Sequence, residues 1–186
     1  MKKYLIIDTS TTDSAICLLL GQEILIQKSL PQMNQTKEII PTIKELLKKN
    51  NLTLQDLSAI AICTGPGLFT GTRVGVMTAK SLSFASDVPL IPFSSFDLFQ
   101  QGALYSALDA KCGRVHLFHD GETTLVPYDD LAAISEAIHV LEIAPFAHLP
   151  IEIILNKKDY KTLYEQLDHS LPQSHNKVVV SYDKNL

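Results

Sequence analysis

The feature that most constrains the fold is an order of predicted elements that occurs twice along the chain. In the first half, apolar runs and helical periodicity predict strands at 4–7, 14–20 and 23–27, a helix at 36–49, a strand at 59–63, a helix at 71–86 and a strand at 88–91. In the second half they predict strands at 106–109, 114–118 and 123–126, a helix at 129–141, a strand at 151–155, a helix at 158–167 and a strand at 178–180. The repeat predicts two α/β lobes, at residues 1–102 and 103–186.

A three-stranded meander followed by crossover helices is similar to the ribonuclease H-like lobe of the actin-like and sugar-kinase superfamily. The resemblance implies two such lobes in one chain. The alternative is that two ordinary α/β runs share this order by accident.

Composition narrows the class of protein. The 186 residues are 46% hydrophobic and 19% charged, which excludes a disordered chain. A formal net charge of −4 gives the chain alone no electrostatic means of holding a nucleic-acid backbone. The sequence shows neither a signal-peptide pattern nor an apolar stretch near the ~20 residues of a membrane helix. Cys17, Cys63 and Cys112 are not at metal-binding spacing. We therefore expect a soluble cytoplasmic protein with reduced thiols.

Two aspartates end corresponding predicted strands. Asp8 is followed by the hydroxyl residues Thr9 and Ser10, at the kind of strand end where parallel sheets gather ligands. Asp109 ends the equivalent strand of the second half, and two carboxylates converging on a cleft would suit a hydrated magnesium ion. The alternative is that each aspartate closes its hairpin by hydrogen bonds to the backbone. The alternative is favoured for Asp109, which no hydroxyl residue follows.

A glycine-rich loop lies between a predicted strand and a predicted helix and runs Gly65-Pro66-Gly67-Leu68-Phe69-Thr70-Gly71-Thr72-Arg73-Val74-Gly75. Such loops are candidate anion sites, because free N–H groups point out of a helix N-terminus. Its spacing fits neither a P-loop nor a dinucleotide fingerprint. The alternative is a turn with positive φ at its glycines, Thr70 as N-cap, and Gly71 and Gly75 allowing close helix packing. Arg73 lies near the positive end of the helix dipole and needs a compensating partner.

The helix predicted at 71–86 has small residues on every side, and its only charges are Arg73 and Lys80. A helix with so little charge is expected to be covered on two sides. One cover is the protein's own sheet. The second is either a helix of a partner or another part of this chain.

The common catalytic and metal-binding motifs are missing from the sequence. There is no HxxxH pair, no CxxC, no G-x-S-x-G elbow and no HExxH. We therefore expect no catalytic residue and no metal site in this chain.

Several ordered segments together resemble the bacterial TsaB (YeaZ) family. They are Leu5-Ile6-Ile7-Asp8-Thr9-Ser10, the glycine-rich loop with Ala79-Lys80 after it, Val88-Pro89-Leu90-Ile91-Pro92-Phe93-Ser94-Ser95, and Leu108-Asp109-Ala110-Lys111 followed by Gly113 and Val115. The resemblance covers residues 1 to about 118. Because this chain is shorter than usual for the family, we expect a reduced second lobe.

The resemblance implies a non-catalytic partner of TsaD, a glycoprotease-like relative. With TsaD and the ATPase TsaE, such proteins make N6-threonylcarbamoyladenosine at adenosine 37 of tRNA. It implies that tRNA is reached only through the complex, that ATP or ADP binds at the partner interface rather than to this chain alone, and that the chain forms a homodimer when TsaD is absent. It also implies that the helices at 36–49 and 71–86 form the partner surface.

Two sets of residues follow from these arguments. We expect the nucleotide-contacting or loop-organising residues to be Asp8, Thr9, Ser10, Gly65, Gly67, Thr70, Arg73 and Asp109. We expect the partner contacts to be Ile39, Ile43, Leu46, Gly75, Thr78 and Ser83.

The sequence also departs from the family pattern. Gln35-Thr36 stands where the family often has a histidine and a hydroxyl residue, and Arg114 and His116 replace an acidic residue and a tyrosine. The main alternative function is an ATP-dependent small-molecule kinase of the same superfamily, which would turn over ATP unaided. A self-sufficient metallopeptidase is a weaker alternative, because its metal ligands are missing.

Overall fold

The apolar runs at the start of the chain form the centre of the first of two sheets. The structure is a computed structural model that describes residues 1–31, 34–100, 102–174 and 177–179. The first sheet is built from β1 (Lys3–Asp8), β2 (Ser14–Leu20), β3 (Glu23–Leu30), β4 (Ala59–Cys63) and β5 (Leu90–Phe93), in the order β3-β2-β1-β4-β5. The first three strands form the predicted antiparallel meander, and β4 and β5 run parallel to β1.

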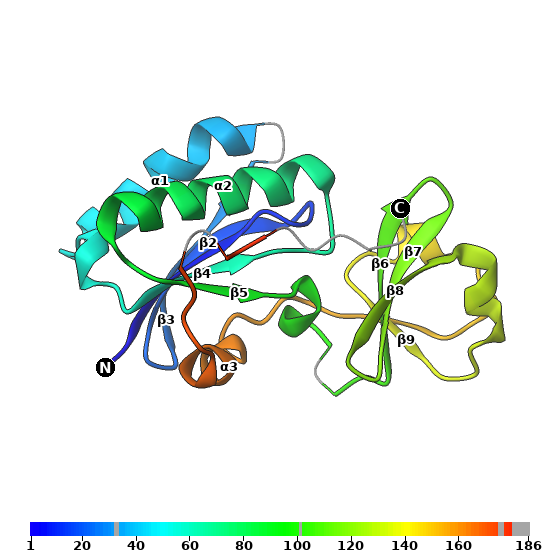
Figure 1. Ribbon diagram of the computed structural model, residues 1–186. Helices are drawn as coiled ribbons and strands as arrows, with labels where there is room; N and C mark the ends of the chain where they lie inside the picture. Colours follow the sequence, from blue (N-terminus) through cyan, green and yellow to red (C-terminus); the bar gives the residue numbers. More distant parts are fainter. Residues whose placement is uncertain (32–33, 101, 175–176, 180–186) are drawn as a thin grey trace. The chain divides into compact units, whose positions relative to one another are not determined.

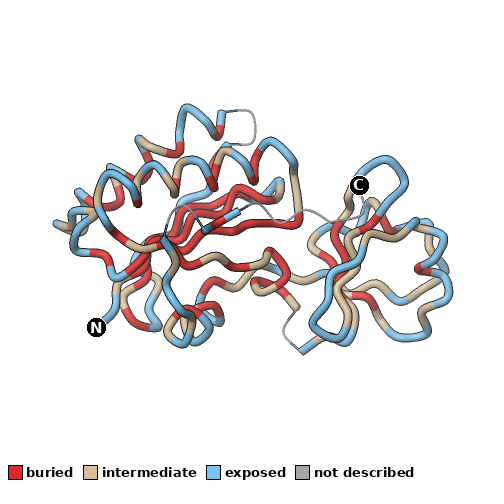
Figure 2. Tube along the Cα trace, viewed as in Figure 1, coloured by how far each residue is buried: buried red, intermediate tan, exposed pale blue. Residues whose placement is uncertain are grey.

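Both faces of this sheet are covered (Figure 1). The helices α1 (Gln35–Lys49) and α2 (Phe69–Ser86) lie on one face, where Leu5 and Ile7 of β1 join their core. The short helix α3 (Leu163–His169) lies on the other face, where the ring of Tyr164 meets that of Tyr4 edge-on. The central strands are therefore buried along their length (Figure 2).

The second sheet repeats the strand order of the first. It is built from β6 (Tyr105–Lys111), β7 (Arg114–His119), β8 (Glu122–Pro127), β9 (Ile138–Val140) and β10 (Ile153–Leu155), in the order β10-β9-β6-β7-β8. Read from β8, this is the order of the first sheet, with an antiparallel meander and then two parallel strands. The mixed α/β class and the repeated meander are thus confirmed.

The helices predicted for the second half are largely wrong. Where a helix was expected at 129–141, the chain forms a 3₁₀ helix, η4 (Tyr128–Ala133), and then β9. Further short 3₁₀ turns are η2 (Leu54–Asp56), η3 (Ser95–Leu98) and η5 (Ala144–Phe146). The helix expected at 158–167 is α3, which begins later. A strand was expected at 178–180, but residues 178 and 179 do not form one, and residue 180 lies outside the described residues.

The chain separates into two units whose limits differ from the expected lobes. The first unit contains Met1–Ser94 and residues 160–179, and the second contains Ser95–Asp159. The difference arises because Phe96 and Phe99 pack with Leu108 of β6, whereas α3 packs on the first sheet. Among the described residues, no helix is both long and apolar enough to cross a membrane.

Candidate functional site

The end of β1 forms a buried polar cluster in the first unit. Asp8, Thr9 and Ser10 are all 0% exposed. One oxygen of the Asp8 carboxylate, Oδ1, accepts hydrogen bonds from the Ser10 N–H at 3.0 Å and the Ser10 hydroxyl at 2.7 Å. The other oxygen, Oδ2, accepts a hydrogen bond from the Tyr160 hydroxyl at 3.1 Å. Both oxygens of Asp8 are therefore engaged by donors of this chain.

Tyr160 reaches Asp8 from a part of the chain that was not predicted to take part. Its side chain is 1% exposed. Burial, and next the charge of Asp8, raise the pKa of the Tyr160 phenol above its usual value. Tyr160 therefore stays a neutral hydrogen-bond donor to the carboxylate. No local pattern in the sequence identifies it, because the two residues are 152 positions apart.

The glycine-rich loop and the start of α2 pack directly on this cluster. A Cβ atom added at Gly67 would lie 2.0 Å from the carbonyl oxygen of Ser10, and one at Gly71 would lie 2.1 Å from that of Thr9. Gly65 and Gly67 both have positive φ, at 97° and 157°. Gly67 and Gly71 are thus required by close backbone approach and Gly65 by its positive φ, as in the packing alternative considered for this loop.

Hydrogen bonds join the two segments at the same place. The N–H of Leu68 donates to the carbonyl oxygen of Ser10 at 2.6 Å, and the Thr9 hydroxyl donates to the carbonyl oxygen of Gly71 at 2.7 Å. Leu68, not Thr70, is the N-cap of α2, and it supplies no side-chain cap. The prediction of Thr70 as N-cap is therefore wrong: Thr70 is an exposed residue of the first turn.

Gln35 also belongs to the cluster, although no role was expected for it. It is the first residue of α1 and is 8% exposed. Its Nε2 donates to the Ser14 hydroxyl at 2.6 Å, and that hydroxyl donates to the carbonyl oxygen of Thr11 at 2.7 Å. Its Oε1 would lie 3.2 Å from a Cβ at Gly71. Gln35 therefore connects α1, β2 and α2 at the carboxyl end of β1.

Arg73 lies outside this cluster. It is exposed on α2, and its guanidinium carbon lies 3.6 Å from the centre of the Phe69 ring. This cation–π contact supplies a partner one turn before it on the same helix.

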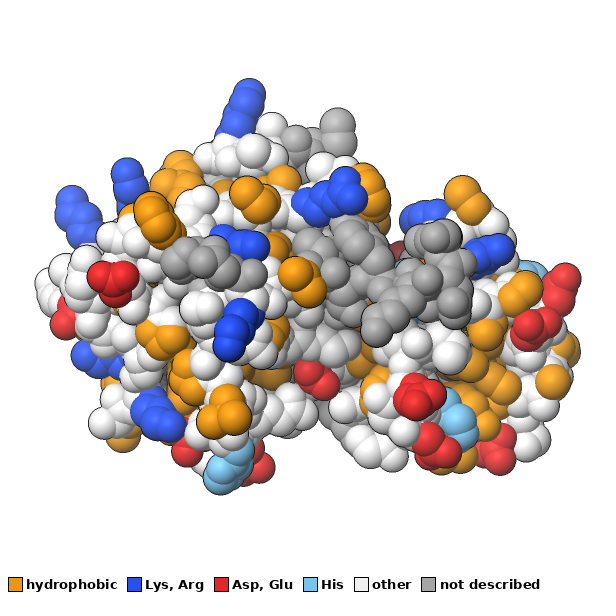
Figure 3. Space-filling view, in the orientation of Figure 1, with side chains coloured by type: hydrophobic (Ala, Val, Ile, Leu, Met, Phe, Trp, Pro, Cys, Tyr) orange, Lys and Arg blue, Asp and Glu red, His pale blue; other side chains and the backbone are white. Residues whose placement is uncertain are grey.

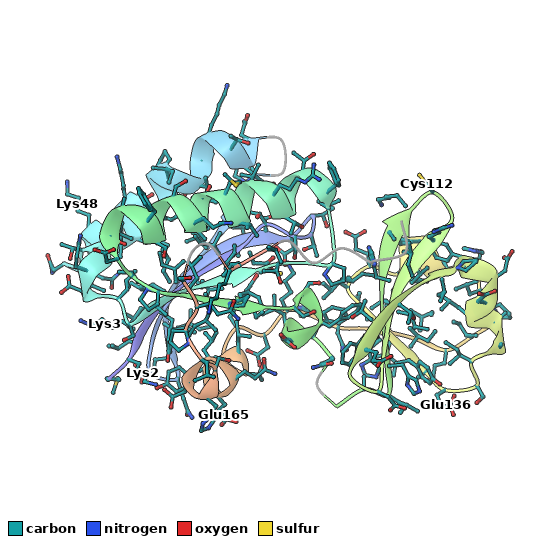
Figure 4. All side chains as sticks on the ribbon, in the orientation of Figure 1. Lys2, Lys3, Lys48, Cys112, Glu136 and Glu165 are labelled. Atoms are coloured by element: carbon teal, nitrogen blue, oxygen red, sulfur yellow. The ribbon has the colours of Figure 1, made fainter. Side chains whose placement is uncertain are left out.

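Asp109 lies in the second unit and closes a hairpin. It accepts a hydrogen bond from the N–H of Lys111 at 2.7 Å and pairs with the Lys111 ammonium at 2.5 Å. Burial acts to raise the pKa of Asp109, but these hydrogen bonds outweigh it and lower the pKa overall. This is the hairpin role considered for Asp109. Cys112 lies at the exposed end of the same hairpin (Figure 4).

Most residues expected to contact a partner face the core of their own unit. Ile39, Ile43 and Leu46 of α1 are at most 2% exposed. Gly75 and Ser83 of α2 are buried, and a Cβ at Gly75 would lie 2.2 Å from the Thr9 hydroxyl oxygen. Of the six expected partner contacts, only Thr78 is half-buried and the other five are buried within their own unit.

The exposed side of α2 carries large apolar residues instead. We call this side the α2 outer face; it consists of Phe69, Arg73, Met77 and Phe84. The three apolar side chains are 58%, 62% and 71% exposed, respectively. The spacing of four, four and seven residues between Phe69, Arg73, Met77 and Phe84 is visible in the sequence, but the partner contacts expected on this helix are small residues at other positions.

Comparisons with known proteins agree with this fold. The model of the TsaD family, described as tRNA N6-adenosine threonylcarbamoyltransferase, matches residues 22–178. The chain is 38% identical over 120 residues to the tRNA threonylcarbamoyladenosine biosynthesis protein TsaB of Haemophilus influenzae, covering 60% of this chain and 51% of that protein. It is 30% identical over 122 residues to the protein of that name from Escherichia coli, covering 61% and 53%. The matches span about half the length of these relatives.

A solved structure extends the likeness to the whole chain. YeaZ from Pseudomonas aeruginosa superposes with a TM-score of 0.78 over 97% of this chain and 100% of that chain, at 19% identity. At this identity the superposition shows a shared fold. Together with the family match over most of the sequence, it shows that the chain belongs to the TsaB (YeaZ) family of TsaD-like proteins.

Proposed function

We propose that this chain is a non-catalytic partner of a TsaD transferase in the formation of N6-threonylcarbamoyladenosine at adenosine 37 of tRNA in the cytoplasm. The observation that carries the proposal is the α2 outer face. The relatives named for threonylcarbamoyladenosine biosynthesis support the pathway, and the TsaD family match supports a TsaD-like partner. The repeated strand order supports two ribonuclease H-like lobes of the actin-like superfamily.

The α2 outer face has the chemistry of a docking surface. Phe69, Met77 and Phe84 are exposed to solvent on one helix. The guanidinium group of Arg73 lies over the ring of Phe69. In Figure 3 hydrophobic side chains lie along the side of the first unit that carries α2, with basic side chains between them. Exposed apolar groups gathered on one element mark protein contacts, and aromatic residues supply much of the binding energy there.

The buried polar cluster supports a structural role for the residues that the sequence marked for chemistry. Asp8, Thr9 and Ser10 direct their hydrogen bonds to each other, to α2 and to Tyr160. A carboxylate held this way fixes a turn rather than reaching a substrate. We therefore assign the bond-making step, and the nucleotide, to the complex with TsaD.

Other partners follow from the same proposal. We expect TsaE to join through TsaD, and tRNA to be held by the assembled complex, because the net charge of −4 does not favour RNA. We expect a second copy of this chain to cover the α2 outer face when TsaD is absent.

The test measures binding to the TsaD homologue of the same organism by calorimetry. Met77→Glu and Phe84→Glu should each weaken binding by about tenfold or more, because each places an unpaired charge in a desolvated contact. Leu155→Glu is the matched control, since this leucine is 52% exposed in the second unit.

Reconstituted tRNA modification tests the activity. Nucleoside mass spectrometry should detect N6-threonylcarbamoyladenosine only when this chain is present. Full modification without it would contradict the proposed function, and ATP turnover by the chain alone would favour the kinase alternative. If both glutamate variants bind as tightly as the control, the docking surface lies elsewhere.

A further inference from the structure

The last described part of the chain, residues 160–174 and 177–179, follows the second unit in sequence but packs with the first. We call it the return segment. It begins on the α3 face of the first sheet and passes the sheet edge, where Gln173 and Leu90 of β5 exchange backbone hydrogen bonds of 3.0 and 2.7 Å. It ends on the α2 face, where Val178 is 1% exposed in the core beneath α1 and α2. The return segment therefore wraps around the outer strand.

The first part of the return segment is fixed by polar contacts. Tyr160 donates to the buried carboxylate of Asp8 at 3.1 Å. Farther along, the Lys2 ammonium lies 2.8 Å from the carboxylate of Asp168, and Figure 4 shows Lys2 beside α3. The return segment is thus attached near both ends of β1, by Tyr160 at the carboxyl end and by Asp168 near the beginning of the strand.

The far end of the return segment is attached to α2. The half-buried Lys80 directs its ammonium to the carbonyl oxygen of Val178 at 3.1 Å. Because the donor is charged, this hydrogen bond is stronger than one from a neutral donor would be.

These contacts form a closed path through the site. Tyr160 contacts Asp8, Asp8 contacts Ser10, and the carbonyl oxygen of Ser10 accepts from Leu68 at the start of α2. Farther along α2, Lys80 returns the path to the segment through the carbonyl oxygen of Val178. The return segment is therefore linked to the start of α2 through Asp8 and Ser10, and it is bonded directly to α2 three turns later at Lys80.

The inner side of α2 explains why it needs such support. It meets the sheet largely through small residues, among them Gly71, Gly75 and Ala79. Small side chains bury little apolar area, so they contribute little to holding the helix. The close approach of α2 to the sheet sets the position of the helix, and other contacts are needed to hold the helix in that position.

We propose that the return segment is a strap that holds α2 in position for docking, with Tyr160 and Lys80 as its two positioning residues. The docking part rests on the proposed function, whereas the strap itself rests on the contacts above. Because binding equilibria that share a conformational element are linked, docking on the α2 outer face should in turn stabilise the strap.

The test is hydrogen exchange followed by mass spectrometry on the full chain. Tyr160→Phe removes the hydroxyl, and Lys80→Met keeps the aliphatic stem but removes the ammonium. Each should speed exchange of the backbone amides at 69–86 by about threefold to tenfold, the effect of losing roughly one hydrogen bond, and leave residues 105–127 unchanged. Tyr164→Phe is the matched control on the same segment and should leave 69–86 unchanged. Lys80→Met keeps the test informative if Tyr160→Phe folds poorly.

A second measurement adds the TsaD homologue. Docking should slow exchange at 160–174 in the wild type, and Lys80→Met should abolish that slowing. Unchanged exchange at 69–86 in both variants overturns the strap. Faster exchange at 69–86 without any slowing of 160–174 on docking overturns its coupling to the partner. If the wild type does not bind TsaD at all, the proposed function fails, and the free-protein exchange alone decides the strap.

Discussion

Thr9 contacts α2 at Gly71 and Gly75, and a side chain added at each of these glycines would clash with a different atom of Thr9. A Cβ at Gly71 would lie 2.1 Å from the carbonyl oxygen of Thr9, which belongs to the main chain and cannot turn away. A Cβ at Gly75 would lie 2.2 Å from the Thr9 hydroxyl oxygen, which can rotate if it gives up its hydrogen bond to Gly71. The two positions should therefore tolerate alanine differently.

We expect Gly71→Ala to lower the free energy of unfolding by roughly 3 kcal/mol and Gly75→Ala by about 1–2 kcal/mol, because only the second clash is relieved by a side-chain rotation. In a Thr9→Ala background the cost of Gly75→Ala should nearly vanish, while that of Gly71→Ala should remain. Urea unfolding of the wild type, the three single variants and the two double variants measures these differences. Equal costs in both backgrounds would contradict the geometry.

Part of this site can be predicted from the sequence, and the rest cannot, for a physical reason. The glycine spacing predicted that the helix packs closely, and it does so at Gly71 and Gly75. The groups that it packs against are not local: Thr9 bonds to Gly71 across 62 positions, and Tyr160 bonds to Asp8 across 152. Local propensity carries no information about such pairs, so the donors to Asp8 could only come from the fold.

Among the elements, α2 shows that small residues and low charge do not reveal which side of a helix faces outward. The low charge of this helix predicts that it is covered on two sides; the first sheet is one cover, and the second stays a prediction. The sequence predicts partner contacts at Gly75 and Ser83, but both are buried within the first unit, whereas Phe69, Met77 and Phe84 are exposed. Close packing on a sheet requires small residues as much as close packing on a partner does.

A pair of arginine substitutions two residues apart separates the two sides of α2. Ser83 is 4% exposed, so Ser83→Arg places an unpaired charge in the core and should destabilise the fold by several kcal/mol. Ser81 is exposed, so Ser81→Arg should change the free energy of unfolding by less than about 0.5 kcal/mol. Thermal melts followed by circular dichroism provide the measurement. A fully stable Ser83→Arg variant would show that this side of α2 is not packed.

The segment at 129–141 shows where helical periodicity misleads. Its later part carries the β-branched residues Ile138 and Val140, which favour a strand. In the structure Ile138 pairs with Tyr105 of β6, and β6 supplies the hydrogen bonds that a lone segment lacks. A three-residue strand at such a position depends on its neighbour, and the sequence of the segment alone does not specify it.

At the scale of the whole molecule, the second unit is an insertion in the first. Residues 95–159 are continuous in sequence, and near their two ends the N–H of Asp159 donates to the carbonyl oxygen of Leu98 at 2.8 Å. The first unit is made of two segments, because the return segment supplies buried residues to its core. The repeat of strand order correctly predicted two similar sheets, but a repeat does not reveal that the chain crosses back after the second one.

This organisation predicts which fragments fold. Residues 95–159 should fold alone into a cooperative unit, although a domain this small buries only about 60% of its chain surface and should melt at a lower temperature than the intact protein. Residues 1–94 alone should not fold, because the segment that covers β5 and contacts Asp8 is missing. Joining residues 1–94 to 160–186 through a short Gly/Ser linker should restore a folded first unit, since Leu98 and Asp159 show that the two ends of the insertion meet. Dispersion in amide NMR spectra and thermal melts distinguish these states. A well-folded 1–94 fragment would show that the return segment is dispensable, and an unfolded linked chain would show that the first unit needs the insertion as well.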